Sequence, residues 1–250
     1  MLGEKKSFDF VVNALNIKAD YYEEDIEKIF IPLIKKLKNI QEEKKRRIIV
    51  YMAAPPGIGK STLSMFLEYI SSENKELSGI QSVGMDGFHH KREYIKSHNA
   101  FVDGKEVPMS KVKGCPETFD VDKLKSKLND MRNNNILWPV YDRKIHDVLD
   151  DKIKITGEIV IVEGNWLLLD EEGWKELAEY CDYSIFIKGN ESMLKDRLIN
   201  RKILGGLSAD EACEFYENSD RKNIHRALSN RKKADLEIEL LNEGKYINRR

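Results

Sequence analysis

Cysteine is scarce in this sequence of 250 residues, and its three cysteines, Cys115, Cys181 and Cys213, lie far apart. They form no CxxC pair, so the sequence predicts neither a disulfide framework nor a zinc ribbon, and a reducing setting fits best. The sequence also lacks the run of about 18 apolar residues that a membrane helix needs. Its first ten residues are mostly charged or polar and do not resemble a signal peptide. We therefore expect a cytoplasmic protein without a membrane partner.

No charge of one sign predominates, because 42 lysines and arginines are balanced by 43 aspartates and glutamates. The formal net charge of −1 gives no general reason to expect a nucleic acid as a partner. The sequence has no internal repeat, no low-complexity tract and no linker that would divide it. We expect a single domain, in which an N-terminal helical segment over residues 1–45 packs on a core over residues 46–250. That segment leaves a homodimer open.

Short apolar runs rich in β-branched residues alternate with stretches of helical periodicity. The apolar runs predict buried strands over residues 48–52, 80–85, 158–162, 183–187 and 236–240. The helical stretches are residues 26–40, 61–70, 121–131, 171–180, 191–204 and 208–217. This alternation predicts an α/β fold with a mainly parallel sheet and helices on both faces.

Three local features refine this prediction. Pro32 interrupts the first helical stretch, so we expect a kink or two consecutive helices there. Ser208 and Glu211 form a capping box, which marks the start of the last helix. The region from Phe88 to Phe119 is longer than an ordinary loop, and we expect it to be a lid or a binding segment.

Residues 54–62 read APPGIGKST and match the pattern GxxxxGK[ST] at every fixed position except the first, Ala54. Glycines in such a loop let the backbone turn its N–H groups toward an anion. Lys60 can reach the β- and γ-phosphates of a nucleotide, and the Ser61 hydroxyl can bind Mg²⁺. A structural turn with an incidental lysine is the alternative, but a strand before and a helix after favour a P-loop. The predicted nucleotide-binding residues are Pro56, Gly57, Ile58, Gly59, Lys60, Ser61 and Thr62.

Two acidic residues follow predicted strands. Asp86 comes after the second strand, where a carboxylate can orient an acceptor hydroxyl and accept its proton. The alternative is that Asp86 only caps a turn with Gly87. Glu163 follows the third strand and can hold a metal ion or its bound water beside the P-loop. Because ligands bind outside the carboxyl ends of the strands in open α/β sheets, both positions suit a site.

The stretch from Glu191 to Leu204 predicts a lid helix. It carries Arg197 and Arg201, whose planar guanidinium groups suit phosphate, and Gly205-Gly206 follows as a hinge. A solvated amphipathic helix is the alternative. The residues His89, His90, His98 and Cys115 do not follow a zinc-ligand spacing, so we do not predict a zinc site.

Five motifs together make the sequence resemble the phosphoribulokinase, uridine kinase and bacterial pantothenate kinase family of P-loop kinases. Within this family it is most similar to bacterial proteins labelled as fructose transport system kinases or nucleoside/nucleotide kinases. The motifs occur in the family's order and extend over most of the chain. They are residues 56–62 (PGIGKST), 85–89 (MDGFH), 113–120 (KGCPETFD), 139–147 (PVYDRKIHD) and 162–165 (VEGN).

The resemblance implies a P-loop NTPase fold, a three-layer sandwich with a lid helix, and a role for particular residues. Asp86 takes the position of the catalytic base, and Lys60 and Arg201 complete the catalytic set. Ser61 and Glu163 take the metal positions, and Arg197 contacts the nucleotide. The residues implied to bind the acceptor are His89, His90, Tyr141, Arg143, His146, Asn165 and Asn223.

The sequence therefore predicts a kinase that uses ATP and Mg²⁺ to phosphorylate a hydroxyl of a sugar or polyol-like metabolite. A nucleoside kinase of the uridine type is an alternative, favoured by Tyr141 and His146. A pantothenate-type kinase is another, because residues 85–89 and 113–120 resemble that enzyme. A switch module that hydrolyses ATP without an acceptor is the alternative from another class. The sequence has no NKxD motif, which argues against a GTPase switch.

Overall fold

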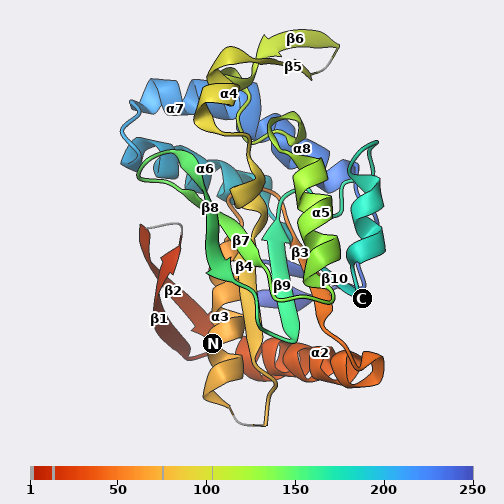
Figure 1. The fold of residues 1–250 in the computed structure, drawn as a ribbon. Coiled ribbons are helices and arrows are strands. Elements are labelled where there is room, and N and C mark those ends of the chain that lie inside the picture. The colour runs from red at the N-terminus through yellow and green to blue at the C-terminus, as the bar shows by residue number, and fades with distance from the viewer. Residues whose placement is uncertain (1–2, 13–14, 75, 103, 250) are drawn as a thin grey trace.

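The computed structural model describes residues 3–12, 15–74, 76–102 and 104–249. At its centre lies a six-stranded sheet (Figure 1). Its strands, from one edge to the other, are β12 (Tyr246–Asn248), β11 (Leu236–Leu240), β10 (Tyr183–Gly189), β3 (Ile48–Ala53), β9 (Ile159–Gly164) and β4 (Ile80–Gly84). All neighbours pair in parallel except β12, which pairs antiparallel with β11. The five predicted strands and the mainly parallel sheet are confirmed.

Helices cover both faces of this sheet, as predicted. The helices α2 (Ile31–Lys44), α3 (Lys60–Glu73) and α6 (Glu191–Leu204) contribute to one buried cluster. On the other face, α5 (Val121–Met131) and the 3₁₀ segment Lys175–Tyr180 contribute to a second. The helices over 121–131 and 191–204 are confirmed at their predicted bounds, whereas the stretch predicted as a helix over 171–180 is 3₁₀ in its second half. No helix in the described ranges is long and apolar enough to cross a membrane.

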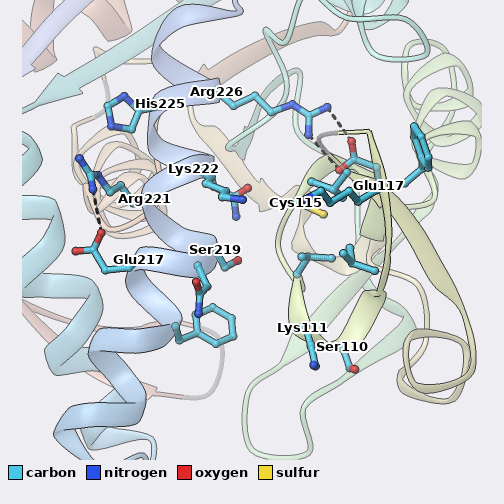
Figure 2. Close-up of a pocket in the computed structure, with 18 of the residues that line it drawn as sticks. Ser110, Lys111, Cys115, Glu117, Glu217, Ser219, Arg221, Lys222, His225 and Arg226 are labelled. Atoms are coloured by element: carbon cyan, nitrogen blue, oxygen red, sulfur yellow. Dashed lines mark hydrogen bonds and ion pairs between the residues drawn. The ribbon is translucent and has the colours of Figure 1, made fainter.

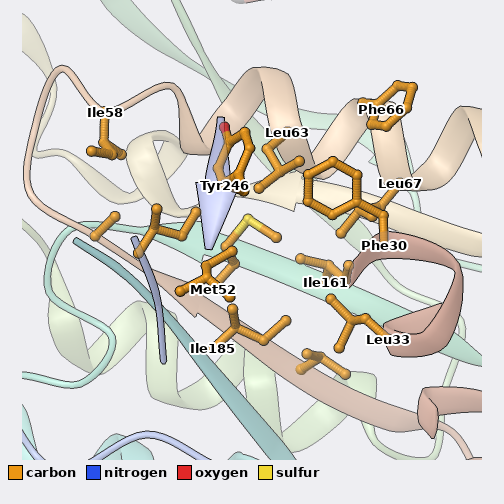
Figure 3. Close-up of a cluster of buried hydrophobic side chains, with 14 of the residues drawn as sticks. Phe30, Leu33, Met52, Ile58, Leu63, Phe66, Leu67, Ile161, Ile185 and Tyr246 are labelled. Atoms are coloured by element: carbon orange, nitrogen blue, oxygen red, sulfur yellow. The ribbon is translucent and has the colours of Figure 1, made fainter. Parts of the chain in front are cut away.

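Strand β3 shows why two clusters form. Its six residues are all buried, and successive side chains enter opposite clusters. Figure 3 shows the first cluster, in which Met52 of β3 lies among Leu63 of α3 and Ile161 of β9. A parallel sheet covered on both faces requires such a continuous apolar run, because neither side of the strand meets water.

The N-terminal segment differs from the prediction. Residues 1–45 were predicted to be helical, but β1 (Lys5–Val12) and β2 (Leu15–Tyr22) form an antiparallel hairpin beside α3 (Figure 1). The hairpin is held by aromatic packing, since the ring of Phe66 on α3 stacks on Tyr21 with centroids 4.0 Å apart. A helical prediction for residues 5–12 and 15–22 is therefore wrong. The alternation of Phe8 and Phe10 with polar neighbours is the strand signal in this segment.

The helical part of this segment follows the hairpin. A short turn of α-helix, α1 (Glu23–Asp25), leads into a π-helical turn over Ile26–Phe30 and then into α2. Pro32 lies in the first turn of α2, directly after the π-helical turn. The break expected near Pro32 is thus confirmed, and it takes the form of a π-helical turn.

The long region from Phe88 to Phe119 contains structure of its own. After the 3₁₀ turn Met85–Phe88 come the helix α4 (Arg92–Ser97) and the hairpin β5–β6 (Asn99–Val102 and Lys105–Pro108). Two further 3₁₀ turns, Met109–Lys111 and Pro116–Thr118, lead back to α5. We call residues 88–119 the arm; its hairpin stands at the top of Figure 1, on the side of α7.

Three more elements complete the fold. A second hairpin, β7–β8 (Leu137–Asp142 and Asp147–Lys154), comes between α5 and β9 in the sequence. Helix α7 (Ala209–Phe215) starts at the predicted capping box of Ser208 and continues through a π-helical turn, Tyr216–Asp220, into α8 (Arg221–Ser229).

Asp182, just before β10, ties the sheet to the end of α2. Its carboxylate is 2% exposed and accepts hydrogen bonds from Arg46 at 2.6 and 2.9 Å and from the Ile49 amide at 3.0 Å. Burial opposes ionisation of Asp182, but these hydrogen bonds outweigh burial and lower its pKa. We expect Asp182→Asn to lower the free energy of unfolding by about 2 kcal/mol at pH 7, since the paired cations are partly exposed. Urea unfolding would measure this.

The same carboxylate gives this prediction a pH dependence. Because folding lowers the pKa of Asp182, its contribution is complete above about pH 4 and is lost as the pH falls through the lower, folded pKa. The difference between wild type and Asp182→Asn should therefore shrink in acid. Asp170→Asn is the control, because that exposed carboxylate pairs with Lys232 at 3.1 Å on the surface and should matter by less than about 0.5 kcal/mol. A constant difference between pH 7 and pH 3 would contradict the assignment.

Candidate active site

The P-loop connects β3 to α3 and turns at two glycines. Gly57 and Gly59 have φ angles of +84° and +100°, which side chains rarely adopt. At Gly57 a Cβ would lie 2.9 Å from Leu198 Cγ, so the loop packs directly against α6. Ala54 is fully buried and is not among the described residues with positive φ, which explains why alanine is tolerated there. The strand, turn and helix that the motif requires are all present.

Glu163 lies at the carboxyl end of β9, next to the start of α3. The Ser61 hydroxyl donates a 2.6 Å hydrogen bond to Glu163 Oε1, and Lys60 Nζ lies 3.8 Å from Oε2. Glu163 is 5% exposed, and its burial raises the pKa of the carboxyl, although Lys60 opposes this. A hydroxyl and a carboxylate side by side could hold Mg²⁺, which takes oxygen ligands and keeps several waters.

Asp86 is placed by the 3₁₀ turn that follows β4, the strand next to β9. In the sheet register Gly84 pairs with Glu163, so the two acidic residues end neighbouring strands. The turn also packs tightly on β7, because a Cβ at Gly87 would lie 2.2 Å from the Pro139 carbonyl oxygen. Trp138 Nε1 reinforces this contact with a 2.9 Å hydrogen bond to the Gly84 carbonyl.

Cations surround Asp86. Arg143 Nη2 lies 3.7 Å from its carboxylate. Burial alone would raise the pKa of Asp86, but His89, Lys60, Arg143 and Arg201 outweigh burial and lower it. His89 is neutral near pH 7, since burial lowers its pKa to about 4, so the two arginines and the lysine are the lasting cause. Asp86 is therefore an ionised carboxylate at neutral pH.

The two arginines of α6 have different surroundings. Arg201 is exposed to solvent, and its charge interacts with those of Arg143, Asp220 and Asp86. Arg197 Nη1 instead donates a 3.0 Å hydrogen bond to the carbonyl of Ile58 in the P-loop. Helix α6 is thus joined to the P-loop by Arg197 and brings Arg201 toward Asp86.

The β7–β8 hairpin and the arm meet at Tyr141. Lys113 of the arm donates a 2.7 Å hydrogen bond to the Tyr141 hydroxyl, and its Nζ lies 3.4 Å from the His146 carbonyl. The His89 and Tyr141 rings make an edge contact with centroids 5.6 Å apart. His146 has an exposed side chain at the hairpin turn, with φ of 56°. Lys113 was not predicted as a site residue, although it is the first residue of the motif over 113–120.

The remaining predicted residues are spread around this centre. His90 stacks on Tyr94 with centroids 4.4 Å apart, away from the pairs that surround Asp86. Asn165 has a buried Oδ1 without a hydrogen-bond partner among the described residues. This oxygen, two residues after Glu163, could accept a hydrogen bond from a ligand. Asn223, on α8, is 6% exposed and lies beside Gly114.

Two hollows border these residues. A cavity of about 470 Å³ has Ser61, Asp86, Tyr141 and Glu163 in its wall. A larger cleft of about 1550 Å³ separates the arm from α7 and α8, and Asn223 lines this cleft but not the smaller cavity. Figure 2 shows Arg226 of α8 reaching across the larger cleft to Glu117 of the arm, a pair 2.8 Å apart. The structure thus brings Asp86 and Tyr141 into one cavity and places Asn223 in the other.

No cluster of three or more histidine, cysteine, aspartate or glutamate side chains in the described ranges is arranged to hold a metal ion. The pair of Ser61 and Glu163 supplies two oxygen donors. That number suits a magnesium ion that also binds nucleotide phosphates and water.

Comparison with known proteins places the chain among kinases. No family model matches it. It is 44% identical to the uncharacterized protein YggC of Escherichia coli K12, over 95% of this chain and 97% of the relative. It is 28% identical to a Schizosaccharomyces pombe protein named as a uridine kinase, over 78% and 84% of the two chains. A solved structure from Silicibacter sp. TM1040, named as a fructose transport system kinase, has a TM-score of 0.73 at 27% identity, over 83% and 98%.

The contact between Gly87 and β7 can be tested directly. Gly87→Ala should lower the free energy of unfolding by about 1 to 3 kcal/mol, because the new methyl group would collide with the Pro139 backbone. Gly79→Ala is the matched control, since a Cβ at that position meets nothing within 4 Å. Thermal or urea unfolding of both variants would measure the effect. Equal stability of the two variants would contradict the close packing of the turn on β7.

Proposed function

We propose that this chain transfers the γ-phosphoryl group of ATP to a hydroxyl of a sugar or polyol. The chain belongs to the phosphoribulokinase, uridine kinase and bacterial pantothenate kinase family of P-loop kinases. One observation carries the proposal. The walls of a single cavity of about 470 Å³ contain Ser61 and Glu163, which suit a metal ion, and also Asp86, which suits a hydroxyl. Such a volume lies within the range of small-molecule sites.

The nucleotide end of the site is formed by the P-loop and α6. The backbone N–H groups of residues 57–62 and the positive end of α3 would bind the phosphates, with Lys60 at the β- and γ-phosphates. Arg201 would meet the negative charge that spreads over the γ-phosphoryl oxygens during transfer. Arg197 would support this arrangement, because its hydrogen bond to Ile58 fixes α6 to the loop.

Ser61 and Glu163 would hold Mg²⁺. The 2.6 Å hydrogen bond between them shows that their oxygen atoms already converge, and the burial of Glu163 keeps competing water away. The ion would neutralise charge on the phosphate oxygens. Glu163 would act directly or through a bound water.

Asp86 would align the acceptor. As an ionised carboxylate it accepts a hydrogen bond from the acceptor hydroxyl and so points the hydroxyl oxygen at the γ-phosphorus. As the new oxygen–phosphorus bond forms, the bond to the β-phosphate oxygen breaks, and the hydroxyl proton passes to Asp86. Little basicity is needed, because the transition state of phosphoryl transfer is loose and positioning supplies most of the catalysis.

The cavity wall supports a sugar or polyol more than a nucleoside. Beyond Asp86 it contains the carboxylate of Glu68, whose oxygen atoms suit hydroxyl groups, whereas the hydroxyls of Ser64 and Ser82 are hydrogen-bonded to each other at 2.7 Å. Tyr141 is the one aromatic residue in the described part of the wall, and its hydroxyl is already bonded to Lys113. Recognition of a nucleobase usually uses aromatic stacking, which this wall supplies only at Tyr141.

A screen of ADP release tests the proposed reaction. Purified protein with ATP and Mg²⁺ is offered ketoses, aldoses, polyols, nucleosides and pantothenate, with Lys60→Ala as the blank. We expect release that depends on a sugar or polyol. If only nucleosides or only pantothenate stimulate ADP release, that compound class is the acceptor and the sugar or polyol proposal is wrong. ADP release that no acceptor stimulates would favour an ATPase module.

Asp86→Asn should lower kcat by about 10²- to 10⁴-fold while ATP affinity is kept, because the amide cannot accept the proton. Steady-state kinetics and ATP binding by calorimetry measure the two quantities. Asp130→Asn, an exposed aspartate on α5, is the control. Normal turnover of Asp86→Asn with intact ATP binding would remove Asp86 from the mechanism.

Glu163→Gln should raise the Mg²⁺ concentration for half-maximal activity by about 10- to 100-fold, since an oxygen with less negative charge would face the ion. Titration of activity with Mg²⁺ at saturating ATP measures this. Glu158 is an exposed residue just before the same strand, and Glu158→Gln should leave the Mg²⁺ dependence unchanged. An unchanged Mg²⁺ requirement in Glu163→Gln would place the metal elsewhere.

A further inference from the structure

Arg226, on α8, binds two carboxylates that come from different parts of the chain. Its Nε donates a 2.9 Å hydrogen bond to Glu171, which lies between β9 and β10 in the sequence, and its Nη1 donates a 3.1 Å hydrogen bond to Glu117 of the arm. Arg226 Nη2 lies 2.8 Å from the other oxygen of Glu117, so this pair is bidentate. The three side chains are only 24–26% exposed. Bidentate pairs of arginine and carboxylate are both strong and directional.

The two halves of this network have different surroundings. Glu171 also accepts a 3.0 Å hydrogen bond from Asn230 Nδ2, and the Asp170 amide donates to the Asn230 carbonyl at 2.9 Å. Arg226 and Glu171 therefore belong to one fixed unit at the end of α8. Glu117 instead belongs to the arm, and its pair with Arg226 connects the two sides of the larger cleft (Figure 2).

Next to Glu117, the end of the arm pairs with its beginning. The Thr118 carbonyl accepts a 3.0 Å hydrogen bond from the His90 amide, and the Asp120 amide donates to the Phe88 carbonyl at 2.8 Å. Thr118 is fully buried. The position of Glu117 therefore bears directly on how the two ends of the arm meet.

The beginning of the arm comes directly after the turn that carries Asp86. The His89 amide donates to the Asp86 carbonyl at 3.2 Å, and the His89 ring stacks on Phe119 with centroids 3.8 Å apart. His89 Nδ1 also lies 3.3 Å from the Thr118 carbonyl oxygen. A displacement of Thr118 or Phe119 would therefore reach the turn that holds Asp86. Phosphoryl transfer depends on alignment, so a small displacement there would be costly.

We propose that Arg226 is a positioning residue for the transfer reaction: it holds Glu117, and Glu117 keeps the end of the arm packed against the residues that follow Asp86. The inference rests on the proposed function, in which Asp86 aligns the acceptor hydroxyl. The contacts lead from α8 through the arm to Asp86, whereas the nucleotide end is formed by the P-loop and α6. Loss of the pair should therefore slow turnover and leave ATP affinity as it is.

Glu117→Ala tests the inference most cleanly, because Arg226 keeps its hydrogen bond to Glu171 in this variant. With an acceptor found by the ADP-release screen, we expect kcat to fall by about 10- to 100-fold, as small misplacements of reacting groups allow, and the KM of ATP to stay unchanged. Arg226→Ala should show the same fall. The double variant should be no slower than either single variant, because both changes remove one interaction.

Arg221→Ala is the matched control. Arg221 lies on the same helix, is 53% exposed and pairs with Glu217 at 3.0 Å, and its loss should leave kcat at the wild-type value. Normal kcat in Glu117→Ala would overturn the inference and leave the kinase function standing. Losses that multiply in the double variant would also overturn it, since the two residues would then act independently. So would an equal rise in the KM of ATP, which would indicate a general loss of structure.

Hydrogen exchange decides the inference even without turnover. If no acceptor stimulates ADP release, the proposed function fails, but the link from Glu117 to the turn of Asp86 can still be measured. In Glu117→Ala the amides of His89, His90 and Asp120 should exchange about 10-fold or more faster, while the amides of β9 keep their wild-type rates. Unchanged exchange at these three amides, or faster exchange throughout the sheet, would contradict the positioning role.

Discussion

The buried carboxylate of Glu163 is the constraint on which the site depends. Strand β9, which ends in this residue, lies between β3, which leads into the P-loop, and β4, which leads to Asp86. The parallel register therefore fixes the separation of the phosphate-binding loop and the aspartate before any ligand arrives. The hydrogen bond from Ser61 and the nearby Lys60 ammonium offset part of the cost of burying this charge. Phosphoryl transfer depends mainly on how the two reactants are positioned, and it therefore requires such rigidity.

Charge is distributed in the site in a way that suits a highly negative ligand. Together with His89, the cations Lys60, Arg143 and Arg201 lower the pKa of Asp86 against the effect of its burial. Arg201 and Arg143 repel each other, and a triphosphate would supply negative charge that offsets this repulsion. Dipoles and charges that are arranged in advance need no reorganisation at the moment of reaction.

The proposed nucleotide end and the proposed acceptor end are built from different parts of the molecule. The P-loop, α3 and α6 are built on the central sheet and its covering helices. The proposed acceptor end instead comes from two segments outside the central sheet, the arm and the β7–β8 hairpin, which meet through Lys113 and Tyr141. Loops at the carboxyl edge of a sheet can vary without disturbing the core, which places acceptor choice in these segments. The N-terminal hairpin adds a further wall, because Val11 and Val12 also line the smaller cavity.

The sequence by itself determined the features whose signals are local. A buried strand, the loop APPGIGKST and a helix follow one another along the chain, and the five strands and the capping box at Ser208 were predicted from short segments. Only the tertiary structure decided which distant residues meet. The hairpin of β1 and β2 depends on Phe66, and the pairing of Lys113 with Tyr141 joins two residues that lie 28 positions apart in the sequence. The position of Arg201 near Asp86 follows from the packing of α6 on Gly57. Periodicity describes one segment's burial, whereas such contacts arise from how separate segments pack.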